Sequence, residues 1–244
     1  MSKHFELLQR ADEEELFIPV GLPKAETRKS TSSPFTKVCL DGEIPNLVHR
    51  LFLQNAEVQG PRVVAFSAIA SDKRSGSICA QTARSLAGLT TKSVCVVDAN
   101  FWSPQLQSHF RADNIRGLAE ALTAAGPIRS FATALRLGDL WLLPTGSARL
   151  DVFGQLDECR ARFAELRDQF HYIIISAPPV TRETEATLMG QLADGMVLIV
   201  DANESRRDAV LRAKERLESA QVQLLGAVLD QRTFPIPEFL YRKL

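Results

Sequence analysis

Short apolar runs alternate along the chain with longer segments that carry apolar residues at helical spacing. Six such runs, rich in Val, Ile and Leu, occur at residues 63–66, 94–97, 140–143, 172–175, 196–200 and 224–229. Short continuous apolar runs are typical of strands covered on both faces, as in a parallel sheet. Their alternation with helices predicts an α/β fold with a doubly wound, mainly parallel sheet flanked by helices.

The segments between the runs have the pattern of amphipathic helices. Residues 150–170 carry apolar side chains three or four positions apart, at Leu156, Cys159, Phe163, Leu166 and Phe170. Residues 205–220 repeat the pattern with Val210, Ala213 and Leu217. A stripe of this kind places one face of a helix against the sheet and leaves the charged face in water.

The regular pattern occupies residues 41–232, which predicts one domain that buries its own core. Residues 1–40 contain clusters of Glu and Asp followed by the run KSTSSPFTK, a composition typical of a flexible arm. Residues 233–244 carry two prolines and form a C-terminal tail. We therefore expect an arm, one α/β domain and a tail.

The composition argues against several classes of protein. Lys and Arg together number 29, as do Asp and Glu, so nothing indicates the basic face that nucleic-acid binding needs. The four cysteines and four histidines are scattered, which favours buried thiols over a zinc site or a disulfide framework. No apolar stretch is long enough to span a membrane, and the N-terminus lacks the apolar core of a signal peptide. These features predict a cytoplasmic protein.

The loop after the first strand stands where many α/β proteins bind phosphate. Residues 67–77 contain one glycine, Gly76, and no Lys directly before Ser or Thr, so the pattern G-x-x-x-x-G-K-[ST] is absent. Asp98 and Asn100 follow the second strand, and Ser176 follows the fourth. Because ligands of doubly wound sheets bind at the carboxyl ends of strands, these positions are the candidates for a site.

The motifs and their flanks resemble the bacterial tyrosine kinases of capsule and exopolysaccharide assembly, within the MinD/ParA-type P-loop ATPases. The resemblance spans roughly residues 43–232. The first loop of that family, P-G-E-G-K-S-T, is matched by SDKRSGS at 71–77. The second motif, apolar-D-x-D-x-R-x-P, is matched by VDANFWSP at 97–104, and the third, apolar-D-x-P-P, by ISAPP at 175–179. The resemblance implies a P-loop NTPase-like fold of the MinD/ParA type.

Position by position, the resemblance implies a degenerate nucleotide site with no catalytic residue. Ser75 and Gly76 stand where the family has its phosphate-binding Lys and its Mg²⁺-binding hydroxyl. Asn100 and Ser176 replace carboxylates of the second and third motifs. The implied nucleotide-binding positions are Lys73, Arg74, Ser75, Gly76, Ser77, Asp98, Asn100, Ser176 and Asp230, the last in place of an adenine-side Asn.

Two further elements depart from the family. Its ring-assembly motif, E-x-x-R-x-x-R, is matched by Glu43, Asn46 and His49, with both arginines replaced. Its tyrosine-rich tail is absent, since Tyr241 is the one tyrosine in the last 70 residues. Loss of several functional elements from an intact scaffold favours a pseudokinase, for which neither a cofactor nor a metal ion is expected.

The resemblance implies a non-catalytic cytoplasmic component of exopolysaccharide or capsule biosynthesis and export. Its implied partner is an inner-membrane polysaccharide co-polymerase, a chain-length regulator that recruits it to the inner face of the membrane; self-association is also open. The first alternative is a residual ATPase or tyrosine kinase that binds ATP and Mg²⁺ through Lys73 or Arg74 with Asp98. A MinD/ParA-like spatial organiser is a further alternative. A dinucleotide-binding domain is disfavoured because no G-x-G-x-x-G follows the first strand.

Single residues keep two interpretations each. Lys73 and Arg74 either hold an anion or form an exposed basic pair. Asp98 either binds a metal ion or caps the following turn. Trp102 either anchors an interface or plugs the nucleotide cleft. Ser176, with no His near it in the sequence, is favoured as a neutralised carboxylate position over a nucleophile.

Overall fold

The computed structural model describes residues 38–39, 43–54, 60–70, 74–148 and 155–231 of the 244-residue chain. The predicted C-terminal tail lies outside the described residues, as does the predicted arm apart from Val38 and Cys39. Lys73 lies outside them too.

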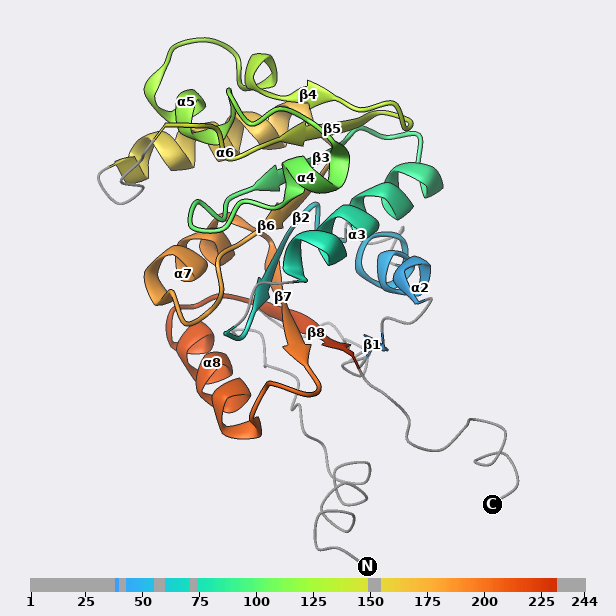
Figure 1. Cartoon of the computed structure of the whole chain (residues 1–244), viewed down its shortest axis with the longest axis vertical. Coiled ribbons are helices and arrows are strands. Elements are labelled where there is room, and N and C mark those ends of the chain that lie inside the picture. Colours follow the sequence, from blue (N-terminus) through green and yellow to red (C-terminus); the bar gives the residue numbers. More distant parts are fainter. Residues whose placement is uncertain (1–37, 40–42, 55–59, 71–73, 149–154, 232–244) are drawn as a thin grey trace, which may run out of the picture.

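One sheet runs through the centre of the molecule (Figure 1). The described residues form eight strands in the order β1-β8-β7-β2-β6-β3-β5-β4, parallel except for β4, which pairs antiparallel with β5 at one edge. The strands are β1 (Val38–Cys39), β2 (Val63–Ala68), β3 (Val94–Asp98), β4 (Thr133–Ala134), β5 (Leu140–Leu143), β6 (Tyr172–Ser176), β7 (Gly195–Asp201) and β8 (Leu224–Asp230). The six predicted runs and the predicted fold class are thus confirmed.

Helices cover both faces of this sheet (Figure 1). One face packs against α2 (Ile44–Val48) with its π-helical extension His49–Leu53, α3 (Ser75–Leu89) and α4 (Leu106–Phe110). The other packs against α5 (Leu118–Thr123), the 3-10 turn Ile128–Phe131, α6 (Leu156–Gln169), α7 (Glu183–Leu192) and α8 (Arg207–Ser219). Within the described ranges, every helix is too short or too polar to cross a lipid bilayer.

Alternate side chains of each strand enter two separate cores, which is why the strand runs are apolar throughout. In β2, Val63 and Ala65 join one core, and Val64 and Phe66 join the other. The stripes predicted for residues 150–170 and 205–220 lie on α6 and α8 and are buried against the first core, at Cys159, Phe163, Leu166, Val210, Ala213 and Leu217.

Charged groups close the amino edge of the sheet, which is the side where the parallel strands begin; the carboxyl edge is the side where they end. The Asp194 carboxylate accepts the backbone N–H groups of Arg62 (2.7 Å) and Val63 (2.8 Å) and pairs with Arg167 Nη1 at 2.7 Å. The Arg62 guanidinium donates to the carbonyls of Arg167, Phe170 and His171, at the end of α6, at 2.9–3.0 Å. The last turn of a helix leaves its carbonyls without partners, so Arg62 caps α6 and links it to β2. The carboxyl edge is therefore left to carry any ligand site.

Candidate functional site

Helix α3 begins directly behind the carboxyl end of β2. Arg74 is its exposed N-cap residue, Ser75 and Gly76 are buried, and Ser77 is half-buried. The Arg74 side chain makes no capping hydrogen bond to this N-terminus, and the Ser77 hydroxyl accepts a hydrogen bond from Gln81 Nε2 at 3.0 Å. The start of α3 therefore lies where the phosphate-binding helix of the resembled family was expected, with Arg74 at its entrance.

Gln105 covers the α3 N-terminus at Gly76. A Cβ atom on Gly76 would lie 2.6 Å from Gln105 Cβ and 2.8 Å from Gln105 Oε1. Carbon atoms do not approach so closely, so no larger residue fits at Gly76 unless Gln105 moves. This packing occupies the space into which a hydroxyl at Gly76 would project.

Asp98 is fully buried at the end of β3, and its carboxylate is used by the loop that follows. Oδ2 accepts the backbone N–H groups of Gln105 and Leu106, both at 2.9 Å, and Oδ1 accepts that of Asn100 at 3.2 Å. The amide oxygen of Asn100 in turn accepts the N–H of Ser103 at 3.3 Å. Asp98 thus makes the turn-capping contacts that the sequence left as one of its two interpretations.

Ser176 lies buried at the end of β6, beside β3. Burial raises the pKa of the Cys79 thiol, a hydrogen bond with Ser176 opposes this shift, and the Asp98 charge adds to it. Ser176, Cys79 and Asp98 therefore lie together beneath the α3 N-terminus. The loop after β6 is held to β2 by the Ser67 hydroxyl, which donates to the Pro178 carbonyl at 2.6 Å.

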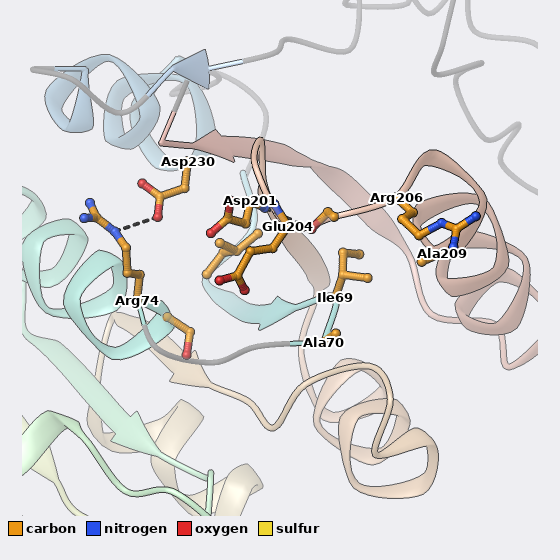
Figure 2. A pocket seen from close by; sticks show the side chains of 11 residues that line it. Ile69, Ala70, Arg74, Asp201, Glu204, Arg206, Ala209 and Asp230 are labelled. Atoms are coloured by element: carbon orange, nitrogen blue, oxygen red, sulfur yellow. Dashed lines mark hydrogen bonds and ion pairs between the residues drawn. The ribbon is translucent and has the colours of Figure 1, made fainter. Parts of the chain in front are cut away.

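Asp230, at the end of β8, is joined to Arg74 across the carboxyl edge. Arg74 Nε lies 2.6 Å from Asp230 Oδ2, and the two side chains are 48% and 3% exposed. Figure 2 shows this pair at the rim of a cavity of about 280 Å³. The cavity is lined by Ile69, Ala70, Arg74, Ser75, Ile199, Asp201, Glu204, Ser205, Arg206, Ala209 and Asp230.

Among the described residues that line this cavity, carboxylates outnumber cations. Asp201 and Glu204 lie between Asp230 and Ile69 in Figure 2, whereas the Arg206 guanidinium points away toward α8. Asp201 Oδ1 accepts the N–H groups of Asn203 (2.8 Å) and Glu204 (3.1 Å), which shapes the loop after β7. Arg206 pairs at 3.4 Å with Asp208 on the exposed side of α8.

The structure gathers most of the predicted site positions and separates three of them. Arg74, Ser75, Gly76, Ser77, Asp98, Asn100, Ser176 and Asp230 all lie at the carboxyl edge or the start of α3. Glu43, Asn46 and His49 lie elsewhere, exposed on α2 and the turn that extends it. Their assignment to self-association stays a prediction.

Gln105, Asp201 and Glu204 belong to the site and were not identified from the sequence. Asp201 could have been found, because it ends the fifth apolar run in the same way that Asp98 ends the second. Gln105 had no such signal, since its contact with Gly76 depends on the path of the loop after β3. Among the described residues, no group of three or more His, Cys, Asp or Glu side chains could hold a metal ion.

Trp102, on the loop after β3, contacts the start of α7. The residue is 61% exposed, yet the Arg182 guanidinium stacks 3.8 Å from the ring centre, and Trp102 Nε1 donates to Glu185 Oε1 at 3.3 Å. Phe101 is half-buried and packs against the core. Trp102 is absent from the lining of the cavity beside Arg74 and Asp230.

The chain has relatives in both sequence and structure. No protein-family model matches the chain. The tyrosine-protein kinase CpsD of Streptococcus agalactiae is 23% identical over 173 residues, which are 70% of this chain and 75% of that protein. YwqD of Bacillus subtilis, also a tyrosine-protein kinase, is 24% identical over 141 residues, 57% and 60% of the two chains. The putative tyrosine-protein kinase CapB of Staphylococcus aureus is 33% identical over 69 residues, 28% and 30% of the two chains.

Solved structures show the same fold at low sequence identity. The chimerical protein CapA2B2 aligns with a TM-score of 0.73 and 19% identity, over 84% of this chain and 88% of the other. The kinase domain of the Escherichia coli tyrosine kinase ETK gives 0.65 and 19%, over 72% and 71%. The cell division protein MinD of Aquifex aeolicus gives 0.56 and 19%, over 75% and 73%. The chain is therefore homologous to the bacterial tyrosine kinases CpsD, YwqD and CapB, with the fold of the tyrosine kinase domains and of the MinD/ParA P-loop ATPases.

Proposed function

We propose that this protein is a non-catalytic relative of the bacterial tyrosine kinases, and that it regulates or scaffolds an inner-membrane polysaccharide co-polymerase in exopolysaccharide or capsule biosynthesis. The observation that carries the proposal is the use of Asp98. Its two carboxylate oxygens accept three backbone N–H groups of the following loop, and the side chain is fully buried. Asp98 is thereby committed to holding the fold.

The described residues do not fit a magnesium nucleotide. Magnesium prefers hard oxygen ligands. In the resembled motifs one hydroxyl and two carboxylate positions hold Gly76, Asn100 and Ser176 here, and the carboxylate that remains, Asp98, is bound to backbone N–H groups. Phosphoryl transfer depends on cations that neutralise the transferred group. Arg74, which stands at the α3 N-terminus, is already paired with Asp230. The carboxylates of Asp201, Glu204 and Asp230 add repulsion toward phosphate along the cavity.

A residual ATP-binding kinase or ATPase is the second candidate. It is favoured by the cavity beside Arg74 and Ser75, which lies at the start of a 15-residue helix and at the carboxyl ends of β2, β7 and β8. Helix N-termini in this position bind phosphate in many α/β proteins. The two candidates differ in whether Mg²⁺ and ATP bind.

Calorimetric titration with ATP and ADP, each with and without Mg²⁺, separates the two candidates. For this protein we expect no heat of binding up to millimolar nucleotide, with CpsD of Streptococcus agalactiae as the positive control. Metal-dependent binding in the micromolar range, together with phosphate release that is lost in Asp98→Asn, would establish the residual kinase instead.

A genetic test addresses the biological part of the proposal. Deletion of the gene is expected to change the amount or chain length of the surface polysaccharide, and the Ser176→Ala variant is expected to restore it fully, because no chemistry at the third motif is required. Unchanged polysaccharide in the deletion strain contradicts the proposed pathway, and failure of a folded Ser176→Ala protein to complement contradicts a non-catalytic role.

A further inference from the structure

The Arg74–Asp230 ion pair connects two parts of the chain that meet at the cavity. Arg74 precedes α3, and Asp230 is the last residue of β8, two strands away from β2 in the sheet. The 2.6 Å contact joins a half-exposed guanidinium to a carboxylate that is 3% exposed. Figure 2 shows the pair at one end of the cavity, with Arg74 Nε facing Asp230.

An anion that approaches the α3 N-terminus from this cavity meets both partners of the pair. An anion that replaces Asp230 at Arg74 Nε removes the ion-pair partner of a carboxylate that stays buried. Leaving a buried charge unpaired costs far more than losing an exposed ion pair. At about 280 Å³, the cavity is also near the lower limit of about 300 Å³ for small-molecule pockets.

We propose that the Arg74–Asp230 ion pair is an internal substitute for a phosphate ligand, which opposes anion binding at the α3 N-terminus and ties α3 to β8 without nucleotide. This inference rests on the proposed non-catalytic function and gives it a physical cause. The arrangement of the carboxyl edge is then independent of nucleotide, and a phosphate-bearing ligand has to compete with a contact made within the chain.

The burial of the two partners predicts an asymmetry between variants. Arg74→Met removes the cation from a buried carboxylate, so the melting temperature is expected to fall by about 4–8 °C. Asp230→Asn removes the buried charge itself and leaves Arg74 free to enter water, so its effect is expected to be smaller. The double variant Arg74→Met/Asp230→Asn is expected to resemble Asp230→Asn alone, and this non-additivity measures the coupling between the two residues.

Arg206→Met is the matched control. Arg206 lies on the rim of the same cavity and also forms an ion pair, but its side chain is 85% exposed and its partner Asp208 is 51% exposed. The melting temperature of the Arg206→Met variant is expected to equal that of the wild type. The inference is overturned if Arg74→Met shifts the melting temperature no more than Arg206→Met does, or if the two single variants are additive. Should Arg74→Met fail to fold, the double variant still folds under the inference, because it contains no unpaired buried charge.

A second readout keeps this inference separate from the proposed function. The melting temperature of the wild-type protein is expected to be the same with and without magnesium ATP. A rise in the melting temperature with magnesium ATP contradicts both the nucleotide-independent function and the proposed role of the ion pair. This holds whatever the melting temperatures of the single and double variants are. An unchanged melting temperature with additive Arg74 and Asp230 effects overturns the ion-pair inference alone.

Discussion

The two edges of the sheet use carboxylates in the same way, although ligands bind at only one edge of a doubly wound fold. At the amino edge, Asp194 accepts two backbone N–H groups and pairs with Arg167. At the carboxyl edge, Asp98 accepts three backbone N–H groups of the loop after β3. The Asp194 side chain is 32% exposed, whereas Asp98 is fully buried. The carboxylate at the ligand edge is therefore the less accessible of the two, which is the behaviour of a structural residue.

The two edges differ in the space that remains between their side chains. The guanidinium of Arg62 closes the amino edge by capping α6. The carboxyl edge keeps a cavity, and one ion pair spans its rim. The charged groups of both edges thus contact the chain itself, and only the carboxyl edge combines these contacts with an open cavity.

The largest effect is expected from Asp98→Ala. It leaves three backbone N–H groups without an acceptor in a buried place, so the free energy of unfolding is expected to fall by about 3–4 kcal/mol. Urea denaturation measures this loss, and Asp98→Asn, which keeps one oxygen, should lose less. A loss below about 1 kcal/mol would mean that Asp98 is not needed for the fold. The carboxylates of the two edges would then not share a structural role.

Asp194→Ala is expected to cost slightly less, about 2–3 kcal/mol, because this carboxylate is partly exposed. Burial alone would raise the pKa of Asp194, but the Val63 N–H, Arg167 and the Arg62 N–H outweigh it and hold the pKa below its ordinary value. A lowered pKa means that the carboxylate stabilises the fold at neutral pH and that this stabilisation is lost as the pH falls through the lowered value.

The difference in stability between wild type and Asp194→Asn should therefore be largest at neutral pH and should shrink in acid. Denaturation series at several pH values measure it. Asp208→Ala, a change at an exposed ion pair on α8, is the control: Arg212 lowers the pKa of Asp208 too, but solvent screens this pair, so the loss of stability should be much smaller than at Asp194 at every pH. A difference that stays constant from neutral to acid pH would show that the charge of Asp194 does not hold the amino edge.

Two glycines of α3 provide a smaller test with opposite signs. Gly76→Ala places a Cβ 2.6 Å from Gln105 Cβ, so it is expected to destabilise the protein by about 1–3 kcal/mol. Gly88→Ala meets nothing within 4 Å and is expected to stabilise it by about 0.5–1 kcal/mol through helix propensity. Gln105→Gly should relieve the cost at Gly76 and not change the gain at Gly88. Equal effects at the two glycines would contradict the close packing of Gln105 on the α3 N-terminus.

The smallest effect concerns the cysteines, which should not react while the protein is folded. Burial raises the pKa of Cys79 and Cys95 far above the usual range, and it raises that of Cys159 to about 11. In a Cys39→Ser background, a thiol reagent at mildly alkaline pH should modify none of the three until denaturant is added. Rapid modification of Cys79 in the native state would mean that the space beneath the α3 N-terminus opens to solvent.

Much of the fold was predictable because strands and helices are specified by local spacing. The six apolar runs became β2, β3 and β5 to β8, and the helical stripes became the buried faces of α6 and α8. Two short strands were not predicted. β1 and β4 contain two residues each, too few to produce a periodic pattern, and they exist because a neighbouring strand edge accepts them.

The candidate site was predictable in its positions and not in its contacts. Residues at strand ends, such as Asp98, Ser176 and Asp230, meet at one edge because parallel strands all end there. The partner of each depends on loops whose paths no periodicity describes. The sequence allows Asp98 either to bind a metal ion or to cap the following turn. Only the positions of the Gln105 and Leu106 amides distinguish these two roles.

The order of residues along the chain specifies the parallel sheet, the layers of helices and the absence of a Lys before Ser or Thr in the first loop, because these follow from local chemistry and spacing. The pairing of Arg74 with Asp230 and the packing of Gln105 on Gly76 emerge in the folded molecule alone. Both contacts join residues far apart in sequence, and they form because the strand order β8-β7-β2-β6-β3 brings the carboxyl ends of five strands to one edge.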